Sequence, residues 1–147
     1  MDTKFSVALH VLAMINEESE ALSSQAIANS VGTNASFIRR VIGLLKNAGL
    51  LESQQGKSGY RLSRSPKEIS LFDIYCATQE KDEITLFHVH QNPNPECPVG
   101  AHIENAVHPL FHAAENQLEQ AFKNQSLDDV IEGLYKSAGV DRPQVKS

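Results

Sequence analysis

Apolar residues recur at helical spacing along most of the chain, and only one region alternates between apolar and polar positions. The 3.6-residue period predicts helices over 4–16, 24–31 and 35–48, a helix after Ser70, a long helix from Pro98 and a short helix after Ser126. The alternating region predicts a β-hairpin, with strands over 50–53 and 60–63 and a tip that contains glycine and lysine. These elements predict a mainly α-helical fold with a small β-wing.

The second and third predicted helices are separated by a short turn with clear boundaries. Ser23 and Asn34 are good N-cap residues, because their side chains can accept hydrogen bonds from free backbone N–H groups of the first turn. Gly32 stands just past the end of the earlier helix, where a left-handed backbone is common. Helices joined so closely cross at a steep angle, which is the helix-turn-helix geometry. With the hairpin that follows, residues 1–66 are predicted to form a winged helix-turn-helix domain that binds double-stranded DNA.

This plan assigns DNA contacts to two places. The N-terminal turn of a recognition helix enters the major groove, and a wing can follow the backbone or enter the minor groove. An arginine can donate two hydrogen bonds to guanine, so Arg39 and Arg40 lead the set. The predicted DNA contacts are Asn34, Ala35, Ser36, Arg39, Arg40, Lys57, Ser58, Tyr60 and Arg61. Two arginines on a helix are also common on merely solvated surfaces, and a winged helix that binds protein instead of DNA stays an alternative.

The distribution of charge favours DNA. The whole chain has a net charge of −5, which alone disfavours nucleic acid. Residues 23–64, however, carry six Lys or Arg against one Glu, so the acidic excess lies on either side of the predicted helix-turn-helix and wing. A basic face on an acidic body can still bind phosphates, because the backbone of DNA meets the local field.

The remaining chain is predicted to connect, dimerise and regulate this domain. Residues 67–98 contain a linking helix and an effector or sensor loop, in which repeated prolines exclude a helix. Residues 99–138 are predicted to form dimerisation helices, since their apolar stripe is close to heptad spacing. We expect a kink or break near Pro109. Residues 139–147 are predicted to form a flexible tail.

The last helix and the cysteines complete the sequence-based expectations. We expect Leu127, Val130, Ile131 and Leu134 to face inward, and Cys76 to be a buried small residue. Two cysteines are too few for a disulfide framework. No apolar stretch is long enough to span a membrane and no signal peptide is evident, so we expect a cytoplasmic protein with no membrane partner.

The chain resembles the Rrf2 family of bacterial transcription regulators over nearly its whole length, most strongly over 36–51 and 59–74. The resemblance implies a homodimer paired through a long C-terminal helix, with two winged domains on a pseudo-palindromic operator, and we expect it to act as a repressor. Two departures bear on DNA contacts. Arg39 stands where the family often has an acidic residue, and the wing tip is shorter by one residue, with Gln55 and Lys57 in place of the usual Arg and Pro.

The resemblance also bears on cofactors. Cluster-binding members place three cysteines at six-residue intervals before the dimer helix, and Cys97 resembles the last of them. Thr85 and Gln91 stand at the two earlier positions, and Gly100 stands where one member has a histidine ligand. One thiolate cannot hold a cluster that needs about four ligands. We therefore expect no iron–sulfur cluster and place the chain with the branch of the family that lacks one.

The role of Cys97 has several alternatives. A thiol near a helix N-terminus can have a lowered pKa, so Cys97 is the predicted sensor of an oxidant or another small-molecule effector. It could equally be a structural residue. A metal-responsive site built from His88, His90, Cys97 and His102 has suitable ligand types but matches no strong spacing pattern. A Cys-His hydrolase is a further alternative, for which no oxyanion motif or third group is evident.

Overall fold

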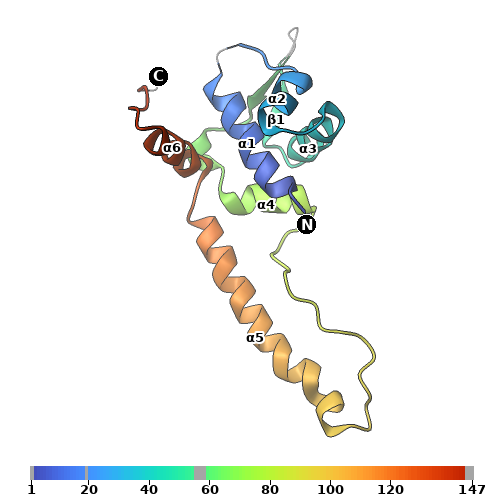
Figure 1. Cartoon of the computed structure of the whole chain (residues 1–147). Coiled ribbons are helices and arrows are strands. Elements are labelled where there is room, and N and C mark those ends of the chain that lie inside the picture. Colours follow the sequence, from blue (N-terminus) through green and yellow to red (C-terminus); the bar gives the residue numbers. More distant parts are fainter. Residues whose placement is uncertain (1, 19, 55–58, 145–147) are drawn as a thin grey trace.

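The computed structural model describes residues 2–18, 20–54 and 59–144 (Figure 1). The helices are α1 (Lys4–Glu17), α2 (Ser24–Val31), α3 (Ala35–Asn47), α4 (Leu71–Gln79), α5 (Pro98–Lys123) and α6 (Leu127–Ala138), with a short 3₁₀ turn, η1 (Pro66–Glu68), before α4. Strands β1 (Leu51–Ser53) and β2 (Tyr60–Leu62) pair antiparallel. The mainly helical fold with a small wing is confirmed.

Helix α1 lies at the centre of the winged domain and contacts α2, α3, α4, α6 and β2. The sequence pattern predicts one apolar face, whereas Val7, Val11 and Ala13 are buried as well. Because neighbours cover α1 from several directions, its buried surface is wider than the stripe of a helix packed on one side only.

Local capping fixes the ends of the short helices. The Ser70 hydroxyl accepts a hydrogen bond from the Asp73 N–H at 3.0 Å, and the Asp73 carboxylate accepts one from the Ser70 N–H at 3.0 Å. Ser126 and Asp129 form the same reciprocal pair at the start of α6. These are capping boxes, which leave few unpaired donors in the first turn.

Helix α5 leads away from the winged domain and none of its residues is buried (Figure 1). Of the predicted kink or break near His108 and Pro109, a break is wrong, because the helix runs unbroken across both residues. Proline removes one backbone hydrogen bond, here to the carbonyl of Asn105. Both residues are exposed, so water can hydrate that carbonyl. Among the described residues, no helix is long and apolar enough to cross a membrane.

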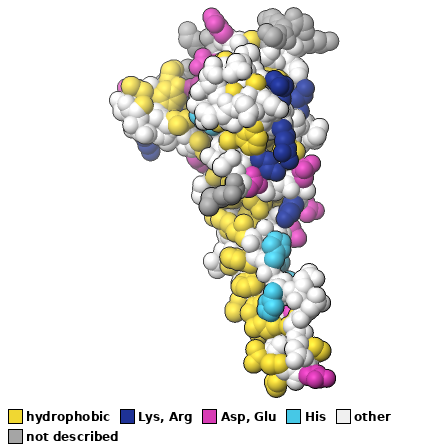
Figure 2. Space-filling model, turned by 45° about the vertical axis from the view of Figure 1, so that its right-hand side comes forward, with side chains coloured by type: hydrophobic (Ala, Val, Ile, Leu, Met, Phe, Trp, Pro, Cys, Tyr) yellow, Lys and Arg dark blue, Asp and Glu magenta, His cyan; other side chains and the backbone are white. Residues whose placement is uncertain are grey.

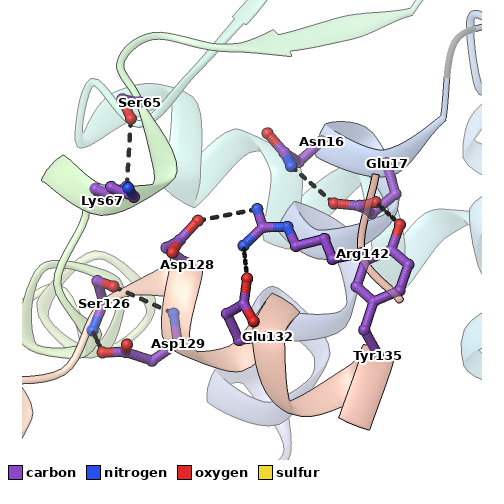
Figure 3. Close-up of polar contacts among 10 residues, drawn as sticks. All are labelled: Asn16, Glu17, Ser65, Lys67, Ser126, Asp128, Asp129, Glu132, Tyr135 and Arg142. Carbon is purple, nitrogen blue, oxygen red and sulfur yellow. Dashed lines mark hydrogen bonds and ion pairs between the residues drawn. The ribbon is translucent and has the colours of Figure 1, made fainter. Parts of the chain in front are cut away.

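Helix α6 returns to the winged domain and packs on α1 and η1. Leu127 and Ile131 are fully buried, as predicted, whereas Leu134 is 51% exposed, so its inward prediction is wrong. Beyond α6, the guanidinium of Arg142 pairs with Asp128 at 2.9 Å and Glu132 at 2.7 Å (Figure 3). Residues just past α6 are therefore held against it, within the range predicted as a tail.

Candidate nucleic-acid interface

Three local features fix the ends of the helices in the helix-turn-helix. The Ser23 hydroxyl accepts a hydrogen bond from the Ala26 N–H at 3.1 Å, and Asn34 Oδ1 accepts one from the Phe37 N–H at 2.8 Å. Gly32 ends α2 with φ +86°, a left-handed conformation that side chains other than that of glycine rarely adopt. The Ser23 cap fixes the start of α2, whereas Gly32 and the Asn34 cap set the direction in which α3 leaves the turn.

Helix α3 divides cleanly into a buried and an exposed face. Its buried side chains are Ile38, Val41, Ile42 and Leu45. Ser36, Arg39 and Arg40 are exposed, and neither arginine side chain forms a hydrogen bond or ion pair with the residues that the structure describes. Lys and Arg side chains gather on one side of the winged domain (Figure 2). The face of α3 that carries these arginines is thus available to phosphates and base edges.

The C-terminal end of α3 is tied to the wing. Lys46 Nζ donates a hydrogen bond to the Ser53 hydroxyl at 2.9 Å, which joins the helix to β1. Gly59 starts the return strand with φ +107°, and a Cβ at this position would lie 2.8 Å from that of Ala21. Only glycine fits there, so the base of the wing packs closely on the segment before α2.

The wing residues that are predicted to contact DNA differ in their exposure. Arg61 lies opposite Glu52 in the hairpin register, and the two side chains form an ion pair. Tyr60 is half-buried and packs against the core. Lys57 and Ser58 lie outside the described residues. The described part of the wing therefore offers one exposed cation, Arg61, whose charge is shared with a carboxylate.

On α3 and its cap, the structure brings together Asn34, Ser36, Arg39 and Arg40 at the exposed surface, while Ala35 is half-buried. Sequence reasoning missed the structural use of Arg64, which donates hydrogen bonds to Asp73 at 2.9 Å and to the Glu68 carbonyl at 3.0 Å. This arginine holds η1 to α4. Its contacts depend on a tight turn that no simple periodicity reveals.

The predicted sensor residue, Cys97, is the exposed N-cap residue of α5. The nearby Gly100 and Val99 N–H groups, at the start of α5, lower the pKa of its thiol, although its sulfur forms no capping hydrogen bond. By contrast, burial raises the pKa of the half-buried Cys76. A Cβ at Gly100 would lie 2.4 Å from the Asn94 carbonyl oxygen, so the loop before Cys97 approaches α5 too closely for any other residue.

The loop that precedes Cys97 is also anchored to the middle of α5. Glu115 accepts hydrogen bonds from the Leu86 N–H at 2.6 Å and the Phe87 N–H at 3.2 Å, and these bonds lower the pKa of its carboxyl. The rings of Phe87 and Phe111 lie 5.0 Å apart. Residues 84–87 belong to no strand, and two of their N–H groups donate to a side chain of α5.

A metal-responsive site would require several ligand side chains close together. Among residues 2–18, 20–54 and 59–144, no three His, Cys, Asp or Glu side chains are placed to hold a metal ion, and this range includes His88, His90, Cys97 and His102. For the hydrolase alternative, no side chain among the described residues forms a hydrogen bond with the Cys97 thiol that would mark a general base.

Comparison with known proteins agrees with this arrangement. A protein of Bacillus subtilis (strain 168) with the name "Putative HTH-type transcriptional regulator YwnA" is 42% identical over 135 residues, which are 92% of this chain and 99% of YwnA. A solved structure with the name "Crystal structure of a putative DNA binding protein" shares 36% identity, with a TM-score of 0.69 over 87% of this chain and 98% of that chain. Staphylococcus aureus CymR shares 25% identity, with a TM-score of 0.65 over 89% of this chain and 97% of its own.

A family model described as "Rrf2: Iron-dependent Transcriptional regulator" matches residues 1–133. The two cysteines do not fit an iron site, because Cys97 is exposed at the start of α5, Cys76 is half-buried in α4, and the described residues gather no ligand group around either. The names of YwnA and of the family model describe transcriptional regulation, which is not an enzymatic function. By its sequence and its winged-helix fold, the chain belongs to the Rrf2 family of DNA-binding transcriptional regulators.

Proposed function

We propose that the protein is a cytoplasmic homodimeric repressor that binds a pseudo-palindromic operator through α3 and the wing. The observation that carries this proposal is the exposed pair Arg39 and Arg40, one turn after the capped start of α3. Arginines at this place in a recognition helix can read guanine in the major groove.

The homodimer part of the proposal rests on α5. Its 26 residues span about 39 Å at the usual helical rise. Val99 and Leu110 are each 69% exposed, and hydrophobic side chains follow the projecting helix (Figure 2). An apolar stripe of this length suits pairing with a second copy, which would present two α3 helices to successive half-sites of one operator.

The signal part of the proposal rests on the loop before α5. Cys97 has a lowered thiol pKa and is open to solvent, which are the two properties of a reactive cysteine. A peroxide would oxidise its thiolate to a sulfenic acid and be reduced to hydroxide. The loop bonds to α5 through Glu115, so a change at Cys97 would reach the dimer helix. Altered pairing of α5 would then change the spacing of the two α3 helices.

The test begins with genome-wide mapping of bound sites, followed by titration of the enriched sequence. Replacing Arg39 and Arg40 with Ala is expected to weaken operator binding by about 1–3 kcal/mol for each lost base contact. The logarithm of operator affinity should also fall less steeply with the logarithm of salt concentration, because phosphate contacts are lost. Lys136→Ala, which removes an exposed cation on α6, is the matched control and should bind normally.

The outcomes separate the alternatives. Absence of an enriched palindrome, or unchanged binding by the double variant, would contradict operator recognition through α3. A repressor predicts that transcription beside the bound sites rises when the gene is deleted, whereas an activator predicts a fall. Retained binding to a protein partner with no affinity for DNA would identify the winged helix as a protein-binding module.

A further inference from the structure

An apolar groove lies between α1 and α6, away from the DNA-binding helix. Its apolar lining comes from Leu9, Ala13 and Met14 of α1 and from Val130 and Leu134 of α6, and its volume is about 390 Å³. Helix α1 lies between α6 and α3 (Figure 1). Nothing in the proposed contact with DNA or in the pairing of α5 uses this groove.

The groove is apolar and open at the same time. Leu134 is 51% exposed, although the sequence pattern of α6 predicts that it faces inward. Val130 lies one turn earlier on the same side of α6, and both side chains face the groove. Large exposed leucines beside a preformed apolar concavity are typical of sites where a partner inserts its own apolar side chains.

The rim of the groove is acidic and partly fixed in place. Glu17 and Glu18 line its edge. Glu17 accepts a hydrogen bond from the Tyr135 hydroxyl and another from Asn16 Nδ2 at 3.0 Å, so its carboxylate is held at the junction of α1 and α6 (Figure 3). Among the described residues no Lys or Arg lines the groove, and the lining residue His10 forms a hydrogen bond with the Ser30 hydroxyl at 3.0 Å. A negative rim repels phosphate and anionic lipid, and it attracts lysine or arginine side chains.

We propose that this groove binds an amphipathic helix with lysine or arginine residues from a different protein. Helix-in-groove recognition places apolar anchors at i, i+3, i+4 and i+7 in such a cleft, and basic residues beside those anchors would meet Glu17 and Glu18. The partner can dock while α3 occupies DNA, because the two surfaces lie on opposite sides of α1.

The charges of this chain argue against a second copy as the occupant. Helix α5 carries the other large exposed apolar surface, but three glutamates lie along it against one lysine. Its approach would bring like charges together at the rim. Six of the 13 Lys and Arg residues of the chain lie within 23–64, the part of the molecule that is proposed to face DNA.

The probe for the test is a synthetic helical peptide of about 14 residues, or about four turns, with Leu at i, i+3, i+4 and i+7 and Lys elsewhere. Its fluorescence anisotropy is measured with the full-length protein. A peptide of the same leucine pattern with Glu in place of Lys is the charge control. Amide and methyl NMR shifts locate the contact, and they should move at Leu9, Ala13, Val130 and Leu134.

Two protein variants test the two halves of the recognition separately. Leu134→Gln keeps the helix propensity and charge of α6 and should weaken binding of the Lys peptide about tenfold, as loss of a buried leucine contact predicts. Glu18→Gln should weaken it about two- to fivefold, and less at high salt. Val140→Gln, which replaces another apolar residue that is 58% exposed, is the matched control.

The outcomes decide the proposal. Equal binding of the Lys and Glu peptides, shifts outside the groove, or full binding by Leu134→Gln would overturn it. A change of oligomeric state in Leu134→Gln would instead identify the groove as an interface between copies and would also overturn it. Operator binding by this variant is expected to be normal, so failure here is distinguishable from failure of the proposed DNA recognition.

Discussion

The winged domain buries many of its apolar side chains, whereas α5 buries none. Ile27, Ile38 and Leu45 of the winged domain are fully buried, whereas α5 has no buried residue along its 26 positions. The domain closes its core with neighbours from its own chain. Helix α5 touches the domain chiefly through Phe122, whose ring lies 5.4 Å from that of Phe5.

This difference indicates how each region is stabilised. A packed core supplies most of the stability of a domain of this size, and isolated helices are marginal in water. Over most of its length, α5 is accompanied only by the loop that Glu115 and Phe111 hold. The winged domain is therefore complete in one copy, whereas the described residues of the same copy leave the apolar side chains of α5 unburied.

The sharpest test of this comparison makes the same substitution in both regions. Leu45→Ala should lower the free energy of unfolding by about 2–5 kcal/mol, because it leaves a cavity in a fully buried site. Leu110→Ala should cost under about 0.5 kcal/mol in dilute protein, since this side chain is 69% exposed in one copy. Urea denaturation followed by circular dichroism measures both values.

Protein concentration provides the internal control for this pair. The loss caused by Leu45→Ala should be the same at every concentration, whereas that caused by Leu110→Ala should grow as association becomes favourable. Equal losses at low concentration would show that α5 is packed within a single copy, contrary to the comparison.

A charge in the stripe of α5 should act on assembly with little effect on folding. Leu110→Asp removes an apolar contact of about 1.5–3 kcal/mol per copy and brings a carboxylate into the proposed interface. We expect the dimer dissociation constant to rise at least about tenfold in analytical ultracentrifugation, with operator affinity falling in parallel.

Leu134→Asp is the matched control, because Leu134 is also an exposed leucine but lies on α6. Its oligomeric state should be that of the unaltered protein. If Leu134→Asp dissociates the protein and Leu110→Asp does not, the surface that pairs the copies lies on α6 instead of α5.

The parts of the fold set by neighbouring residues could be predicted from the sequence. Ser23, Gly32 and Asn34 determine the helix-turn-helix through contacts no more than four residues away, and the structure confirms each one. The burial of Val11 and Ala13 could not be predicted from a stripe, because it depends on α1 being covered by distant helices.

The candidate site was predictable to a similar extent. Arg39 and Arg40 are exposed as their place in α3 predicts. The ion pair between Arg61 and Glu52 follows from the strand register, which the lengths of the hairpin strands could have indicated. The exposure of Leu134 could not be predicted in this way. The sequence shows that this residue is apolar, but it does not show that α1 leaves it uncovered.

The hydrogen bonds that anchor the loop to α5 should contribute less free energy than apolar packing in the core or along α5. Glu115→Gln replaces charge-assisted hydrogen bonds with neutral ones, a loss of about 1 kcal/mol. We expect about fivefold faster hydrogen exchange at the Leu86 and Phe87 amides, with no change at α3. Because the carboxyl pKa is lowered, the anchoring is present above the usual pKa of glutamate, and it is lost as pH falls through the lowered value. Exchange that is unaffected by the substitution would show that Phe87 and Phe111 alone hold the loop.

The smallest expected effect distinguishes the two cysteines without altering the fold. The thiol pKa of Cys97 is lowered by the Gly100 and Val99 N–H groups, and that of Cys76 is raised by burial, so at neutral pH a larger fraction of Cys97 is thiolate. Iodoacetamide followed by mass spectrometry should label Cys97 first, with a rate that levels off at lower pH than the rate for Cys76. In urea the two rates should converge, because both the effect of these N–H groups and the burial are lost. Equal rates in the folded protein would remove the chemical basis for Cys97 as a sensor and would leave α5 as a dimer helix that receives its signal elsewhere.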